Sequence, residues 1–200
     1  MERYLRKDQR IIATVNLLVI GGYTIFFLTR LDFEFLLYVG IIILIFGLLL
    51  ISNKKVGYSN LTLWGMTIWG ILHMSGGGIP VGDDVLYSKI LIPLSTSYEI
   101  LKYDQVVHIF GFATATLLMY ELMRPLMHKE ALGTKRLSFI LVMSGAGLGS
   151  LNEIFEFIAT VLVPENGVGG YVNTSLDLIA NLIGALIALF IIRYRAKKVS

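Results

Sequence analysis

Long apolar runs separated by short charged stretches dominate this sequence. Five of these runs meet or approach the roughly 20 residues that a helix needs to cross a bilayer. They lie at about 11–29, 33–51, 104–123, 136–163 and 173–193. Because each unpaired backbone polar group in lipid costs several kcal/mol, runs of this length are expected to be helical. The sequence therefore predicts an all-α integral membrane protein.

The positions of lysine and arginine predict the number and direction of the spans. A sixth, shorter run at about 59–76 is needed if the basic residues are to alternate between the two sides. All but three of the 17 Lys and Arg residues then fall at the termini and in the second and fourth connections; the exceptions are Arg30, Lys89 and Lys102. Basic residues favour the cytoplasmic side. We therefore expect a bundle of about six transmembrane helices with both termini in the cytoplasm, as a multi-pass protein of the cell membrane.

The composition fits a single membrane domain over residues 1–200. Charged residues make up 16% of the chain, against about 25% in soluble domains. The net charge is only +3 and the basic residues flank apolar runs, so the expected partner is the lipid bilayer and no nucleic acid. There is no cysteine, which excludes disulfides, thiolate metal sites and a cysteine nucleophile. The first run is long enough to span and no A-x-A-like site follows it, so we expect a retained helix rather than a signal peptide.

The longest connection covers residues 77–103 and is expected on the outer side. Its stretch from Val85 to Leu94 is apolar but too short to cross a bilayer. This stretch could be a re-entrant or interfacial segment, or a lid over an outward-facing site.

Ionisable side chains inside three of the predicted spans are the main functional signal, because such groups are expensive in lipid. Each span carries two polar residues three or four positions apart, which places both on one helical face. The pairs are Asp104 with His108, Glu153 with Glu156, and Asp177 with Asn181. His73 lies near the outer end of the third predicted span. With the predicted orientation, all of these residues lie in the outer half of the bilayer, which predicts one site open to the extracytoplasmic side.

Carboxylates and imidazoles at these spacings can hold a metal ion, and helical bundles build di-metal sites in this way. Oxygen and nitrogen ligands without thiolate suit Zn²⁺, Mn²⁺ or Fe²⁺. The candidate metal ligands are Asp104, His108, Glu153, Glu156, Asp177 and His73, with Asn181 in support. Without a metal, the same groups could serve as general acid and base or relay protons. The candidate catalytic groups are Glu153, Glu156 and His108.

Structural explanations compete with this interpretation. Asp104 could cap the fourth span, and Asp177 fits a capping box with Thr174. An ion pair between His108 and a glutamate, or a hydrogen bond from Asn181 across helices, would need no ligand. Glu153 and Glu156 are the hardest to explain in this way, since they lie mid-helix in an apolar stretch.

Small residues on the fifth predicted span indicate close helix packing. Gly145 and Gly149 are four positions apart, with Ser144, Ala146 and Ser150 beside them. This is the GxxxG spacing of helices that approach closely in membranes. No strand precedes it and no GK[ST] follows, so it is no phosphate-binding loop.

The same polar segments resemble the YjdF-type family of bacterial inner-membrane proteins and, more distantly, VanZ-like proteins. The resemblance covers roughly residues 60–190. Its pieces are LH at 72–73 with GG at 76–77, YDQVVH at 103–108 with GF at 111–112, NEIFEF at 152–157 and DLIANLIGA at 177–185. It implies a multi-span protein whose acidic and imidazole positions are the family signature. VanZ-like members are associated with glycopeptide resistance, which implies a role at the cell envelope. The E-x-x-E piece at 153–156 departs from the VanZ-like pattern, which tends to have Glu followed by Gln.

Three functions are compatible with the sequence. The first is a metal-dependent membrane enzyme that acts on a lipid or lipid-linked envelope substrate at the outer leaflet. The second is a proton- or cation-coupled transporter or flippase, although neither an inverted repeat nor a polar path through the cytoplasmic half is visible. The third is a non-catalytic membrane protein whose polar cluster only specifies helix packing.

Overall fold

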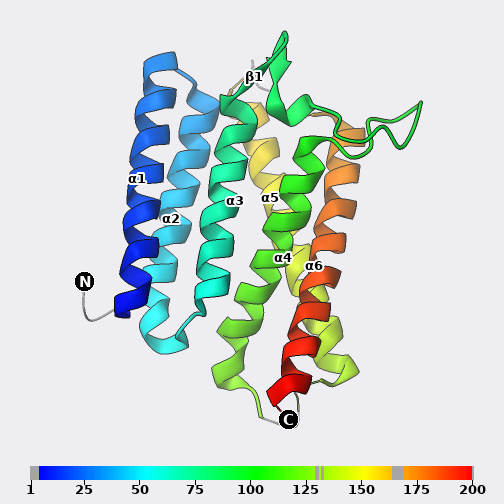
Figure 1. Ribbon diagram of the computed structural model, residues 1–200. Coiled ribbons are helices and arrows are strands. Elements are labelled where there is room, and N and C mark those ends of the chain that lie inside the picture. The colour runs from blue at the N-terminus through cyan, green and yellow to red at the C-terminus, as the bar shows by residue number, and fades with distance from the viewer. Residues whose placement is uncertain (1–4, 129–130, 132, 164–168, 200) are drawn as a thin grey trace.

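Six α-helices lie side by side in one bundle in the computed structural model, which describes residues 5–128, 131, 133–163 and 169–199 (Figure 1). The helices are α1 (Lys7–Arg30), α2 (Phe33–Val56), α3 (Asn60–Gly78), α4 (Tyr103–Met123), α5 (Lys135–Leu162) and α6 (Tyr171–Val199). Each predicted span coincides with one helix, apart from residues at the ends. Arg3 and Lys129, counted above among the basic residues, lie outside the described residues.

The fold class predicted from the apolar runs is confirmed: this is an all-α membrane protein. In the described part of the chain, five helices are long and apolar enough to cross a bilayer, namely α1, α2, α4 with its short extension, α5 and α6. The helix α3 lies alongside them with 19 residues, is shorter than these five and is not among the helices long and apolar enough to cross. The count of six spans therefore stays a prediction.

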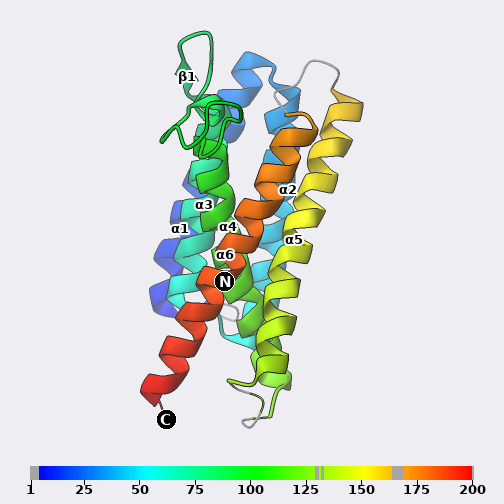
Figure 2. The ribbon, with the colours of Figure 1, turned by 90° about the vertical axis from the view of Figure 1, so that its right-hand side faces the viewer.

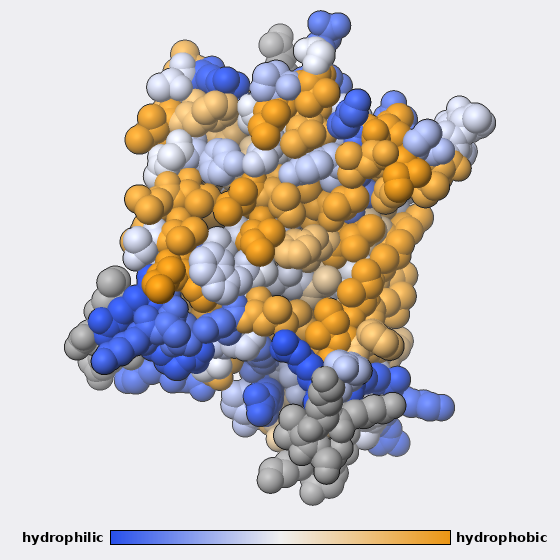
Figure 3. All heavy atoms as spheres, viewed as in Figure 1, coloured by the Kyte–Doolittle hydropathy of each residue, from blue (hydrophilic) through white to orange (hydrophobic). Residues whose placement is uncertain are grey.

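The outer surface of the bundle is apolar where a soluble protein would be polar. Figure 3 shows an almost continuous hydrophobic band between hydrophilic residues at the two ends. Leu18 and Phe190, for example, expose 71% and 73% of their area. Apolar surface of this extent is stable when lipid chains cover it.

Short connections with local caps make neighbouring helices antiparallel. Two residues join α1 to α2: Leu31 has a left-handed backbone with φ of 55°, and the side chain of Asp32 accepts a hydrogen bond from the backbone of Phe35. Gly57 closes α2 with φ of 67°, and Ser59 caps α3. One end of the bundle, at the bottom of Figure 1, consequently holds both termini and the α2–α3 and α4–α5 connections. We call it the lower end, and the opposite end the upper end.

The connection between α3 and α4 folds over the upper end of the bundle. It contains a two-stranded hairpin of β1 (Pro80–Val81) and β2 (Asp84–Val85) and the 3₁₀ helix η1 (Leu86–Ser88). Residues 90–94 are exposed there. The apolar stretch from Val85 to Leu94 thus forms a cover at the bundle end and no re-entrant helix.

The two halves of the bundle have separate apolar clusters. Phe27, Phe35, Tyr38, Val39 and Met74 form one in the α1–α3 half, together with Ala159 of α5. Leu117, Leu137, Leu141, Ala188 and Ile192 form the other between the lower parts of α4, α5 and α6. Figure 2 shows these last three helices packed along one another. The candidate site lies among them, nearer the upper end.

Candidate functional site

Close approach of α6 to α4 and α5 brings the polar side chains together. A Cβ atom at Gly184 would lie 2.3 Å from the carbonyl oxygen of Ile109, so only glycine lets α6 lie this near to α4. A Cβ atom at Gly149 would meet the side chain of Asn181, and one at Gly145 would meet Thr116. The close packing predicted for the fifth span is therefore present in the structure.

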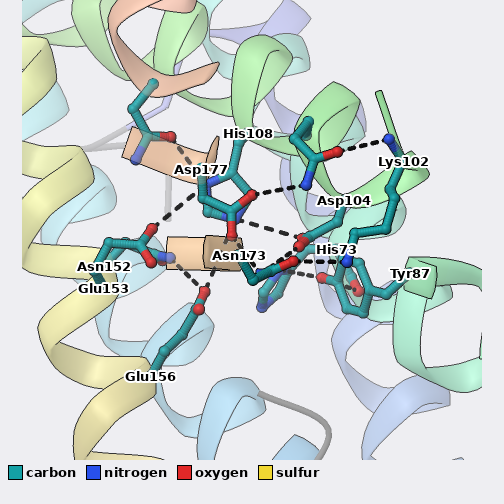
Figure 4. Close-up of polar contacts among 12 residues, drawn as sticks. His73, Tyr87, Lys102, Asp104, His108, Asn152, Glu153, Glu156, Asn173 and Asp177 are labelled. Atoms are coloured by element: carbon teal, nitrogen blue, oxygen red, sulfur yellow. Dashed lines mark hydrogen bonds and ion pairs between the residues drawn. The ribbon is translucent and has the colours of Figure 1, made fainter. Parts of the chain in front are cut away.

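His108 lies at the centre of the site on the second turn of α4, with its side chain only 5% exposed (Figure 4). Its Nε2 atom lies 3.5 Å from Asp104 Oδ1 and 3.9 Å from Glu156 Oε1. Its Nδ1 atom lies 3.7 Å from Glu153 Oε1 and 2.9 Å from Asn181 Oδ1. The helices α4 and α5 thus direct carboxylates toward the two nitrogens of one imidazole ring, and α6 directs an amide oxygen toward one of them.

Asp177 forms a second part of the site and is fully buried. Its two carboxylate oxygens accept hydrogen bonds from Gln105 Nε2 at 3.2 Å and from Asn173 Nδ2 at 2.5 Å. The same Asn173 nitrogen donates to Asp104 Oδ2 at 3.2 Å, and Lys102 Nζ donates to Asn173 Oδ1 at 2.7 Å. Asn173 therefore bridges the two aspartates on one side and an ammonium group on the other.

The capping explanations for the two aspartates are wrong. The residue at the N-cap of α4 is Lys102, and Asp104 is the second residue of the helix. The helix α6 begins at Tyr171, so Asp177 lies in its second turn, beyond the position that a capping box requires. Both carboxylates instead point into the bundle toward other helices (Figure 4).

Glu153 is the most unusual member of the site. Its side chain is 8% exposed, and neither carboxylate oxygen has a hydrogen-bond partner among the described residues. The Nδ2 atom of Asn181 is also buried without a partner in that part of the chain. Glu156, by contrast, accepts a hydrogen bond from Asn152 Nδ2 at 2.7 Å. Buried polar groups are almost always paired, so the Glu153 carboxylate calls for a proton, a cation or another donor.

Two overlapping sets of side chains have the geometry to hold an ion. In each set, one potential ligand atom per residue lies within 4.8 Å of the others. The sets are Asp104, His108 and Asp177, and His108, Glu153 and Glu156. Five of the six predicted metal ligands therefore come together around one shared imidazole. The chemistry of the donors, oxygen and imidazole nitrogen without sulfur, matches Zn²⁺, Mn²⁺ or Fe²⁺.

His73 lies beside the site but in neither of these sets within the described residues. Its Nδ1 atom is 2.5 Å from the hydroxyl of Tyr87, which also donates to the His73 carbonyl oxygen at 2.8 Å. Its ring stacks on Trp69 with centroids 5.4 Å apart. Burial raises the pKa of Tyr87 well above its usual range, which keeps the phenol protonated as a donor. Gly76 makes room for that ring.

The polar partners of the carboxylates were not predicted. Gln105, Asn152 and Asn173 hold carboxylates in place, and Lys102 holds Asn173. A signal was available for two of them. Asn152 precedes Glu156 by four residues and Asn173 precedes Asp177 by four, the same spacing that revealed the charged pairs.

The fold and the site together define a helical membrane protein with a buried histidine–carboxylate cluster in one half of its bundle. A family model described as "Predicted membrane protein (DUF2238)" matches residues 10–198, and the chain belongs to that family. The matched region includes every residue of the cluster. No curated protein and no solved structure matches the chain.

Proposed function

We propose that this protein is a metal-dependent enzyme of the cytoplasmic membrane that acts on a lipid or lipid-linked envelope substrate. One divalent transition-metal cation would be held by His108 with carboxylates from α4, α5 and α6. The observation that carries the proposal is the buried Glu153 carboxylate, which faces His108 but accepts no hydrogen bond at either oxygen in the described part of the chain. A cation beside Glu153 would supply the partner that its carboxylate lacks.

The charge balance of the cluster supports a cation. Four carboxylates surround a single imidazole, and the ion pairs of Asp104, Glu153 and Glu156 are all with His108. The nearby ammonium group of Lys102 is bonded to Asn173 and paired with Glu99. Burying this much negative charge is unfavourable unless protons or a positive ion compensate it.

The position of the cluster supports a substrate that arrives from the outer leaflet. The cluster is nearer the upper end of the bundle, whereas most lysines and arginines belong to the termini and connections at the lower end. By the positive-inside rule the lower end is cytoplasmic, which gives six spans with both termini inside. The side chains of Asp104 and Glu156 each keep 15% exposure, so a reacting group can approach them. The YjdF-type and VanZ-like resemblance supports the same placement at the envelope.

Transport is supported less well, because apolar packing separates the cluster from the lower end in the described part of the chain. Below His108, the hydroxyls of Thr114 and Thr116 donate to carbonyl groups of their own helix. The apolar cluster that includes Leu117 and Leu141 then fills the space between the helices. A coupled transporter needs groups that pass the ion onward. A purely structural cluster, in turn, would leave both Glu153 oxygens without a hydrogen bond among the described residues.

Elemental analysis of purified protein tests the metal. We expect about one Zn, Mn or Fe per chain in the wild type and at least a tenfold loss in Glu153→Gln and in His108→Ala. Asp83→Asn is the matched control, since it removes an exposed carboxylate from the hairpin at the same end. A wild-type protein that folds, carries no metal and takes none up on dialysis would contradict the proposal.

Lipid analysis tests the reaction. Membranes that contain the wild-type protein, incubated with a lipid extract of the host, should lose one lipid species and gain its product. Chelation should stop this conversion, added metal should restore it, and Glu153→Gln should abolish it. An unchanged lipid profile with metal-loaded protein would reject the enzymatic role and leave metal binding to stand by itself.

A further inference from the structure

An elongated apolar cavity lies in the other half of the bundle, between α1, α2 and α3. Its upper part and a second, lower part each have a cavity volume of about 30 Å³ and are partly open to the outside of the bundle. Both parts are lined by Asn16, Phe46, Leu49 and Met66, so the two parts adjoin one another along the three helices. It extends from Leu5 and Gln9 near the lower end to Tyr23 and Met74 in the upper half. None of the cluster carboxylates lines it.

The amide and hydroxyl groups in this lining already have partners. Asn16 Nδ2 donates to the carbonyl oxygen of Ile12 at 2.8 Å and to Thr67 Oγ1 at 2.7 Å. Thr67 donates in turn to the carbonyl oxygen of Leu63 at 2.9 Å. At the lower end, Gln9 is bonded to Asn53 at 2.8 Å. An apolar cavity whose polar groups are satisfied offers little to water or to a polar ligand.

The glycines show that the space differs from the tight interfaces elsewhere. A Cβ atom at Gly70, which lines the cavity in the middle of α3, would meet nothing within 4 Å. On the same helix, a Cβ atom at Gly65 would lie 2.6 Å from Thr114 of α4. The face of α3 that carries Gly65 therefore packs tightly against α4. The face that carries Gly70 leaves room toward α1 and α2.

We propose that this cavity binds one hydrocarbon chain of a membrane lipid. The cavity lies along helices whose outer faces are covered by bilayer hydrocarbon, so lipid chains are the molecules present at this depth. Its apolar lining favours a chain over a headgroup, and filling it recovers dispersion contacts that a void forfeits. The proposal stands on the cavity alone and does not depend on a metal in the cluster.

Trp69 makes the proposal measurable. This residue lines the cavity and also stacks on His73, and the chain has only one other tryptophan, Trp64. Trp64 is 37% exposed on the outside of the bundle and is not part of the lining. Fluorescence of Trp69 in a Trp64→Phe background therefore reports the cavity. Fluorescence of Trp64 in a Trp69→Phe background reports the surrounding bilayer.

The experiment is quenching by vesicles of phosphatidylcholine brominated on one acyl chain. We expect strong quenching of Trp69, reduced at least twofold by Gly70→Leu, whose side chain fills the cavity. Trp64 should be quenched equally with and without that substitution. Gly22→Leu is the matched control, because it adds the same side chain at an exposed glycine outside the lining, and it should leave Trp69 quenching unchanged.

Two results would overturn the proposal. Equal quenching of Trp69 with and without Gly70→Leu, in protein that keeps its unfolding temperature, would show that no lipid chain enters the cavity. Quenching that falls as the protein-to-lipid ratio rises would assign the space to a second copy of the chain. If Gly70→Leu does not fold, Gly70→Val supplies the same comparison with a smaller side chain.

Discussion

The two halves of the bundle use glycine in opposite ways. In the α4–α6 half, Gly149 and Gly184 let neighbouring atoms approach to distances that any Cβ atom would prevent. In the α1–α3 half, Gly70 borders open space. The difference follows from what each half buries. Charged groups require fixed, short contacts with their partners, whereas an apolar cavity tolerates loose packing because a lipid chain can adapt to it.

Replacing a glycine by alanine in each half should give the largest difference between the halves in the free energy of unfolding. Gly184→Ala places a methyl group against the backbone of Ile109 and Ala113, and we expect it to lower the free energy of unfolding by about 3 kcal/mol. Gly70→Ala meets no atom and should raise it by up to about 1 kcal/mol, the helix-propensity difference. Thermal unfolding in detergent measures both. Equal effects of the two substitutions would remove the contrast between the halves.

Metal removal should lower the unfolding temperature through the loss of contacts in the α4–α6 half. A ligand present at 100 times its dissociation constant stabilises a fold by about 2.7 kcal/mol, so chelation should lower the unfolding temperature by roughly 5–10 °C. The variant Glu153→Gln should show little further change on chelation, since it has lost the metal already. Thr67→Val, in the other half, should respond to chelation as the wild type does. A chelator-insensitive wild type would count against the cation.

The smallest effect concerns the hydrogen bond between α1 and α3. Thr67→Val keeps the volume of the side chain and removes the hydroxyl that Asn16 contacts at 2.7 Å. Hydrogen bonds between membrane helices contribute about 0.6 kcal/mol on average, and a loss of that size is expected. Metal content should stay at the wild-type level. A loss of metal in this variant would mean that the two halves are coupled and that our division of the bundle is wrong.

Much of the fold and part of the site could be predicted from the sequence, because both rest on periodicity. Apolar runs located the helices, and three-to-four-residue spacing placed Glu153 with Glu156 and Asp104 with His108 on shared faces. Spacing within one helix does not define which helices are neighbours. The contact of Asn173 with both aspartates and the separation of His73 from the ligand sets therefore required the three-dimensional arrangement. The cavity also had no sequence signal, because its lining resembles any lipid-facing surface.

The most direct test of the central claim is X-ray absorption spectroscopy of the purified protein at the edge of its bound metal. We predict about four nitrogen and oxygen ligands at roughly 2.0–2.2 Å, with the signature of one imidazole, no sulfur, and loss of the imidazole signal in His108→Ala. A fully hydrated ion, or a spectrum that His108→Ala does not change, would show that the cluster is not the metal site.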